Sequence, residues 1–174
     1  MNKYLFYLVV LIIILPKLAF SDRAIININA NVIERSCTID NESQNLIVDL
    51  QGGDLRQSNI GVGMPFAGTA FSIKLVDCPA NISVAHIKFS GESDVTMGNL
   101  LKNTDSTVQA AQGVALGLYS GNNNIDIRNN QTTLTLDHSL ESNIFKFFVY
   151  YVKTGGVANP GKVISIADFE VAYD

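Results

Sequence analysis

Two cysteines, two histidines and one acid-histidine-serine trio are the residues whose types could do chemistry. Cys37 and Cys78 are the only cysteines among the 174 residues, and their spacing is not the Cys-x-x-Cys of redox and zinc motifs. His86 and His138 are too few and too isolated to complete a zinc site. The sequence therefore predicts neither a metal centre nor a redox dithiol, and we expect no cofactor.

Asp137, His138 and Ser139 are the residue types of a hydrolytic triad, but they are adjacent in the sequence. Neighbouring side chains on a strand or turn point apart, so the three cannot form a relay by themselves. The chain also has no Gly-x-Ser-x-Gly, no His-Glu-x-x-His and no glycine-rich phosphate loop. A solvated turn is the favoured interpretation, and the sequence predicts that the protein is not an enzyme.

The first 21 residues have the pattern of a secretory signal peptide. Lys3 precedes an apolar run over residues 5–15, and small side chains at Ala19 and Ser21 favour cleavage before Asp22. A retained membrane anchor is the alternative, but the apolar run is shorter than the roughly 20 residues that a spanning helix needs. We therefore expect export and no stable membrane insertion after cleavage.

The mature chain of roughly 150 residues suits one domain with its own core. Export would place Cys37 and Cys78 in an oxidising compartment, where a pair of cysteines normally forms a disulfide. Such a cross-link stabilises a fold by roughly 4 kcal/mol, because it restricts the unfolded chain. The formal net charge of −4 and the lack of a lysine or arginine run predict no nucleic-acid partner.

Alternating apolar and polar residues recur along the mature chain and predict an all-β fold. No stretch keeps the three-four spacing of an amphipathic helix. Polar, glycine-bearing turns separate the alternating segments, as in a β-sandwich. The predicted strands cover residues 69–77, 82–89, 113–119, 144–153 and 162–173.

The last of these predicted strands, residues 162–173, carries apolar side chains on both of its alternating faces. We expect its first half to be covered on both sides. The apolar residues are Val163, Ala167, Phe169, Val171 and Tyr173 on one face, and Ile164, Ile166 and Ala172 on the other.

Residues 22–35 alternate cleanly and predict a strand with one apolar face and one face rich in asparagine. An ordinary first strand of the chain's own sandwich is one interpretation. A strand that serves another domain is the second, because residues 22–33 could extend about 40 Å, comparable to the length of a domain of this size. The apolar face would carry Ala24, Ile26, Ile28, Ala30 and Val32.

Several segments resemble the chaperone-usher fimbrial subunits, in particular the minor pilins of type 1-like and P-like fimbriae. Most specific are the penultimate Tyr173 and Gly161, the fourteenth residue from the end, because these pilins carry a tyrosine and a glycine at those places. The donor strand of the family usually has a glycine after an asparagine, where this chain has Ala30 after Asn29. The other similar segments are residues 32–38 (VIERSCT), 48–50, 53–55, 71–79 (FSIKLVDCP), 87–91 and 111–116.

The resemblance implies an incomplete immunoglobulin-like β-sandwich that lacks its seventh strand and leaves an apolar groove beside its last strand. In the family, a periplasmic chaperone fills this groove first, and the N-terminal extension of the next subunit replaces it by donor-strand complementation. Residues 1–21 would be the signal peptide, 22–36 the donor-strand extension and 37–174 the pilin domain. The groove and chaperone-binding segment would include Gly161, Val163, Phe169, Val171, Tyr173 and Asp174.

The resemblance further implies a structural subunit of a fimbria that polymerises by donor-strand exchange and contributes to bacterial adhesion. Its expected partners are a periplasmic pilus chaperone, an outer-membrane usher and neighbouring fimbrial subunits. Its expected location is a fimbrium on the cell surface, reached through the periplasm. A tip-associated pilin with its own glycan-binding loops is the alternative, for which the chain offers tyrosine and phenylalanine but no tryptophan to stack on sugar rings.

Overall fold

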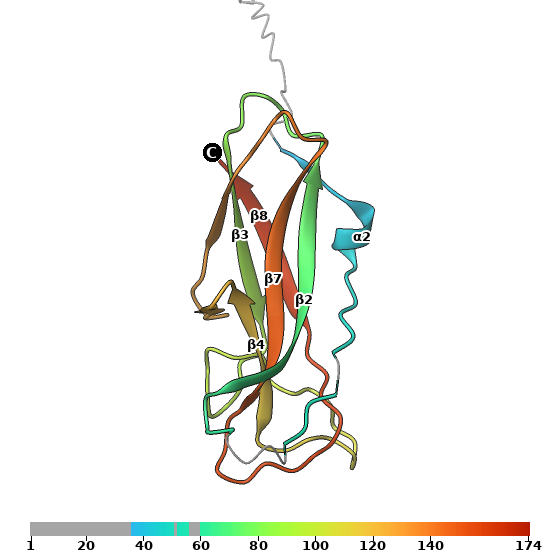
Figure 1. Cartoon of the computed structure of the whole chain (residues 1–174), viewed down its shortest axis with the longest axis vertical. Coiled ribbons are helices and arrows are strands. Elements are labelled where there is room, and N and C mark those ends of the chain that lie inside the picture. The colour runs from blue at the N-terminus through green and yellow to red at the C-terminus, as the bar shows by residue number, and fades with distance from the viewer. Residues whose placement is uncertain (1–35, 51, 56–59) are drawn as a thin grey trace, which may run out of the picture. The chain divides into compact units, whose positions relative to one another are not determined.

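A computed structural model of the chain describes residues 36–50, 52–55 and 60–174. The described part consists of two antiparallel sheets that face each other as two layers (Figure 1). The all-β prediction is confirmed. The elements are β1 (Thr38–Ile39), α2 (Asn41–Gln44), β2 (Pro65–Val76), β3 (Val84–Gly91), β4 (Val114–Ser120), β5 (Asn123–Ile125), β6 (Thr132–Thr135), β7 (Ser142–Lys153) and β8 (Ala167–Tyr173).

The two sheets differ in size. The larger sheet has the strand order β1-β2-β7-β4-β5, and the smaller sheet has the order β6-β3-β8. β2 and β7 pair over nearly their full length, with a bulge between Phe66 and Thr69 that shifts their register. In the smaller sheet β3 lies in the middle, so β8 stands at an edge.

The core lies between the two sheets and is built from the inward faces of the strands. Along β7, Phe145, Phe147 and Val149 are buried, whereas the side chains between them are more exposed. Phe147 packs edge-to-face on Phe89 of the smaller sheet, with ring centroids 4.9 Å apart. Its centroid lies 5.5 Å from that of Phe71 on β2. These three rings join the two layers.

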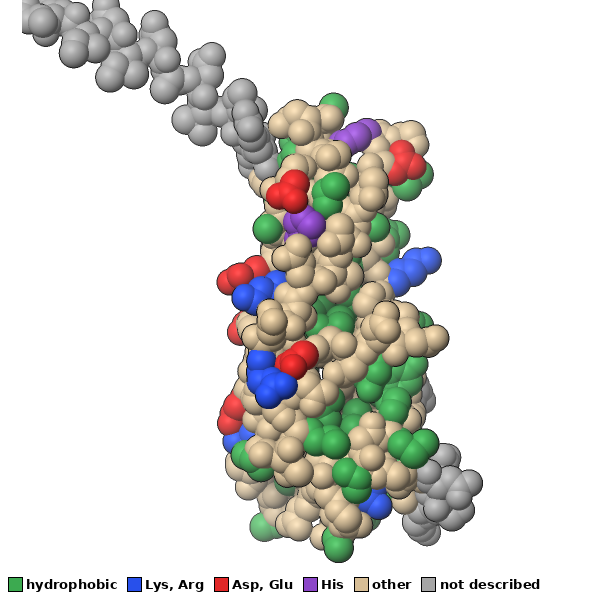
Figure 2. Space-filling view, turned by 90° about the vertical axis from the view of Figure 1, so that its left-hand side faces the viewer, with side chains coloured by type: hydrophobic (Ala, Val, Ile, Leu, Met, Phe, Trp, Pro, Cys, Tyr) green, Lys and Arg blue, Asp and Glu red, His purple; other side chains and the backbone are tan. Residues whose placement is uncertain are grey.

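Hydrophobic side chains also remain on the surface of the sandwich. Ile47, Val108 and Ile166 are among the exposed ones. Figure 2 shows hydrophobic side chains gathered in the lower half of one face. The core is therefore not the only place where apolar residues collect.

The alternation pattern does not predict the shortest elements. β5 and β6 contain three and four residues, and most of these are asparagine or threonine, so the apolar alternation is too brief to recognise. The four residues of α2 are likewise too few to show helical spacing. Within the described ranges no helix is long and apolar enough to cross a membrane.

The segment before β8 corrects a prediction. The prediction of one strand over residues 162–173, covered on both faces in its first half, is wrong. β8 begins at Ala167, and Ile164 and Ile166 are 39% and 69% exposed. Lys162 forms a parallel bridge with Ala110, and Thr104 N donates to Ile164 O at 2.7 Å. These contacts hold the segment against a loop rather than in the sheet.

Candidate functional site

β8 has one bonded edge in the part of the chain that the structure describes. It pairs with β3 from Ala167, opposite Gly91, to Tyr173, opposite Ala85. The smaller sheet ends at β8 on the other side. An edge strand presents unpaired N–H and C=O groups to which another strand can bond. β8 therefore has one edge without a partner strand among the described residues.

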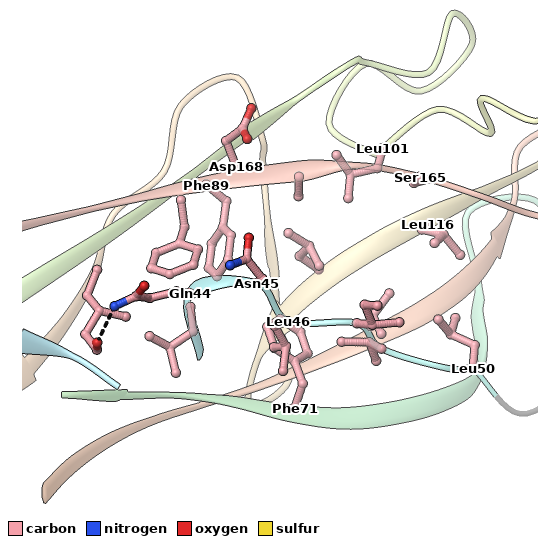
Figure 3. A pocket seen from close by; sticks show the side chains of 18 residues that line it. Gln44, Asn45, Leu46, Leu50, Phe71, Phe89, Leu101, Leu116, Ser165 and Asp168 are labelled. Atoms are coloured by element: carbon pink, nitrogen blue, oxygen red, sulfur yellow. Dashed lines mark hydrogen bonds between the residues drawn. The ribbon is translucent and has the colours of Figure 1, made fainter. Parts of the chain in front are cut away.

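A groove of about 670 Å³ lies beside this edge. One wall comes from the start of β8 and the residues before it, and the other from residues 44–50 (Figure 3). Polar groups of Gln44, Asn45, Ser165 and Asp168 occur among its lining residues. Its apolar lining further includes Leu101 from the segment between β3 and β4. From the strands of the larger sheet and from β3 it includes Phe71, Ile73, Phe89, Leu116, Leu118 and Val149.

The lining residues from the sheets belong to the same cluster of packed side chains that forms the core. Ile73, Leu116 and Leu118 are nearly inaccessible, although they line the groove. The groove is therefore an opening onto the core and not a separate surface pocket. Apolar side chains that entered it would be removed from water and would extend the core.

Residues 44–50 form the second wall without joining either sheet. Ser43 Oγ accepts a hydrogen bond from Lys74 N at 3.0 Å, in the place where a neighbouring strand would bond to β2. Gln44 Nε2 donates to Ile39 O at 2.9 Å, the dashed line in Figure 3. The backbone of residues 46–50 makes no hydrogen bond to another residue that the structure describes. Both walls of the groove thus carry available backbone groups.

Hydrogen bonds link the end of β8 to residues next to both sheets. Tyr173 is half-buried, and its hydroxyl donates to the carbonyl oxygen of Cys37 at 3.3 Å. Asp174 N donates to Val84 O at 3.0 Å, and Asp174 O accepts from Ser83 N at 3.1 Å. Cys37 is bonded to Cys78, which confirms the predicted disulfide.

The six residues of the C-terminal segment that the resemblance assigns to the groove occupy different places in the structure. Phe169 is one of the lining residues. Val163, Val171 and Tyr173 pack against the core cluster, but the side chains that line the groove do not include them. Asp174 is exposed just beyond β8.

Gly161 lies before β8 and serves a close approach of two backbones. A Cβ at this position would lie 2.4 Å from Gln109 O and 2.5 Å from Ala111 N. Lys162 N donates to the same Gln109 O at 2.7 Å. Only glycine leaves room for this contact, which directs the chain toward β8.

Asp137, His138 and Ser139 form an exposed turn, as the sequence predicts. Asp137 Oδ1 accepts from Ser139 Oγ at 2.6 Å and from Ser139 N at 2.9 Å. These bonds lower the pKa of the Asp137 carboxyl. Such contacts are those of a polar turn. Among the described residues, no cluster of three or more histidine, cysteine or acidic side chains could hold a metal ion.

The expected donor strand lies outside the described residues. The predicted signal peptide over residues 1–21 and the predicted start of the extension at Asp22 also lie outside the described residues. Only Ser36, the last residue of the predicted extension, is described. These assignments stay predictions. The donor residues concerned are Ala24, Ile26, Ile28, Ala30 and Val32.

Two parts of the groove are not predicted from the sequence. One is the wall of residues 44–50, although the apolar run from Leu46 to Val48 directly after a polar stretch is a usable signal. The other consists of Leu101, Leu116 and Leu118. No local pattern marks these three, because they are ordinary core residues that become groove residues only where the cover is missing.

A family model described as fimbrial protein matches residues 26–174. The chain belongs to the fimbrial protein family. The family resemblance seen in the sequence is therefore confirmed. As a fimbrial subunit, the protein is a structural, non-enzymatic component of surface pili that assembles with neighbouring subunits.

Curated relatives of this fimbrial subunit match it along most of their length. The uncharacterized fimbrial-like protein YcbU of Escherichia coli is 25% identical over 159 residues, which span 90% of this chain and 87% of YcbU. YdeS of the same organism is 26% identical over 159 residues, 89% of each chain. Long polar fimbria protein A of Salmonella typhimurium is 24% identical over 152 residues, 86% of this chain and 83% of the relative.

Solved pilus structures share the fold of the subunit. The P pilus rod subunit PapA is 19% identical with a TM-score of 0.62, over 79% of this chain and 99% of PapA. A chain in the structure of a chaperone-usher pilus is 18% identical with the same TM-score of 0.62, over 91% of this chain and 100% of that chain. The likeness confirms the immunoglobulin-like pilin sandwich.

Proposed function

We propose that this fimbrial subunit polymerises by donor-strand exchange in a chaperone-usher fimbria and thereby contributes to bacterial adhesion. The groove beside β8 accepts an extended strand from a neighbouring subunit, and residues 22–33 are donated in turn. A periplasmic chaperone occupies the groove before assembly, and the outer-membrane usher is where the exchange takes place.

The observation that carries this proposal is the apolar groove next to the edge of β8 that has no partner strand among the described residues. An extended strand in the groove would bond to the backbone of β8 and, on its other side, to residues 46–50. Its alternate side chains would lie over Leu116, Leu118 and Phe169. Each large apolar side chain buried in this way contributes roughly 1.5–3 kcal/mol. Both the backbone and the side chains of an added strand would therefore be stabilised.

The sequence of residues 22–33 has the pattern that such a groove requires. Ile26, Ile28 and Val32 would face the groove together, and a slip by one residue would instead bury Asn27 and Asn29. Burying an amide without a hydrogen-bond partner is unfavourable. This difference supports one register of the donated strand.

A strand-exchange assay scored in both directions tests the proposal. Labelled full-length subunit, purified with its chaperone, is mixed with unlabelled wild-type complex, and acceptance and donation are measured separately. Phe169→Asp should stop acceptance but preserve donation, because an unpaired carboxylate in an apolar groove costs several kcal/mol. Ile28→Asp should stop donation but preserve acceptance for the same reason.

Ile166→Asp is the matched control, since this side chain is 69% exposed immediately before β8. It should leave both directions unchanged. Deletion of residues 22–31 should reproduce the effect of Ile28→Asp. Non-reducing mass spectrometry checks that each variant retains its disulfide. Unchanged donation by the deleted chain, or unchanged acceptance by Phe169→Asp, contradicts the proposal.

A further inference from the structure

His86 contacts Asp174, the residue directly after β8. Its Nε2 lies 2.7 Å from Asp174 Oδ2. Its Nδ1 lies 2.9 Å from both Thr133 Oγ1 and Gln131 Nε2. Because the amide nitrogen of Gln131 only donates, Nδ1 is an acceptor, and Nε2 carries the hydrogen that is donated to Asp174.

The position of His86 lets one side chain connect three strands. His86 lies on β3, the middle strand of the smaller sheet, opposite Thr133 on β6 and Ala172 on β8. Its neighbours Ala85 and Ile87 face the core, so His86 faces outward. The side chain is only 17% exposed, because the groups that it bonds cover it. The imidazole therefore joins β3 to β6 and to the residue that follows β8.

Asp174 is held from two directions at this end. Its backbone nitrogen donates to Val84 O at 3.0 Å, and its carbonyl oxygen accepts from Ser83 N at 3.1 Å. Its side chain accepts from His86. Here the backbone contacts fasten one side of the residue, and the imidazole restrains its side chain.

We propose that His86 is a positioning residue for strand acceptance. By holding Asp174 against β3, it keeps the last part of β8 in register as an acceptor edge before a partner strand arrives. This inference rests on the proposed function of the groove. An edge that is already ordered loses less conformational entropy when a strand is added, so acceptance is faster and retention is tighter.

Hydrogen exchange tests the contact in the full chain bound to its chaperone. His86→Leu should raise the exchange rates of the Ser83 and Asp174 amides by about fivefold, the effect of one lost hydrogen bond of ordinary strength. His86→Gln keeps an N–H donor and should stay close to wild type. Lys88→Gln changes the same outward face of β3 without a contact to Asp174 and is the matched control. Equal exchange in His86→Leu and wild type overturns the inference.

Uptake of a peptide of residues 22–33, with displacement of the chaperone, tests the role in acceptance. His86→Leu and Asp174→Ala should each slow uptake by about fivefold. The double variant should be no slower than either single one, because both changes remove one contact. If the effects of His86→Leu and Asp174→Ala on the uptake rate multiply in the double variant, or if His86→Leu takes up the peptide at the normal rate, the positioning role is overturned while the proposed function stands. A wild-type chain that takes up no peptide contradicts the proposed function itself and the inference with it.

Discussion

The hydroxyl of Tyr173 donates a hydrogen bond to the carbonyl oxygen of Cys37, 3.3 Å away. Tyr173 ends β8 in the smaller sheet, and Cys37 precedes β1 in the larger one. Burial raises the pKa of Tyr173, so its hydroxyl remains a protonated donor at neutral pH. The bond therefore links β8 to the opposite layer, next to the Cys37–Cys78 disulfide.

Tyr173→Phe should lower the free energy of unfolding by about 1 kcal/mol, because it removes one hydrogen bond and leaves the Cys37 carbonyl without its partner. Urea unfolding of the full chain measures the change. Tyr150→Phe is the control, since Tyr150 contacts other rings on the outer face of the larger sheet. If both variants unfold at the wild-type midpoint, the bond between the two layers makes no contribution.

Replacement of Cys37 and Cys78 by serine should reduce the yield of the exported subunit. The disulfide closes a loop with a sequence separation of 41, and loss of such a cross-link costs roughly 4 kcal/mol on the entropy model. Periplasmic yield and capture by the chaperone are the measurements. Wild type expressed under reducing conditions should behave like the double variant. Two free thiols in the exported wild type would contradict the premise.

Gly161→Ala should destabilise the subunit by about 1–3 kcal/mol, the usual effect of forcing atoms into a packed site. The new methyl group would lie 2.4 Å from Gln109 O, and backbone atoms cannot turn away as a side chain can. Gly156→Ala is the matched control, because a Cβ there has no other atom within 4 Å. The midpoints of thermal unfolding compare the two. Equal midpoints would show that the segment before β8 shifts freely.

Asp126 should titrate well below an ordinary aspartate. Arg128 donates from Nη2 to Oδ2 at 2.7 Å and from Nε to Oδ1 at 2.9 Å, and these bonds lower the pKa of Asp126 to about 2. Because the pKa of Asp126 is lower in the folded state than in the unfolded chain, the stability that its pairing with Arg128 contributes is complete above a pH of about 4. It is lost as the pH falls through about 2.

Carboxyl NMR titration of the full chain measures this value. Arg128→Gln should return the pKa of Asp126 toward the 3.8 of an unperturbed aspartate. Asp105 is a useful internal reference, since the pKa of its carboxyl is also lowered. The cause there is hydrogen bonding from Thr107 and not an arginine side chain. A wild-type Asp126 that titrates near 4, or one that Arg128→Gln does not change, would contradict the assigned cause.

The sequence by itself determined the class of fold, the cysteine pair and the family. These follow from local patterns, because alternation reports which face of a strand a residue occupies. Ile73 and Leu75 on β2 are buried as the alternation predicts, and Phe145 and Phe147 on β7 follow the same rule. The spacing of Tyr173 and Gly161 from the end carried the resemblance, although the alternation did not predict that residues 162–166 lie outside β8.

Only the tertiary structure decided which backbone edges are left open. Periodicity reports the face of a residue but not its neighbouring strand, so the sequence could not show that residues 44–50 form a wall of the groove. Nor could it show that residues before Ala167 leave the sheet, because that depends on Gly161 meeting residues 109–111. The contact between His86 and Asp174 joins residues 88 positions apart. Such contacts arise only when strands distant in sequence take their places in one sheet.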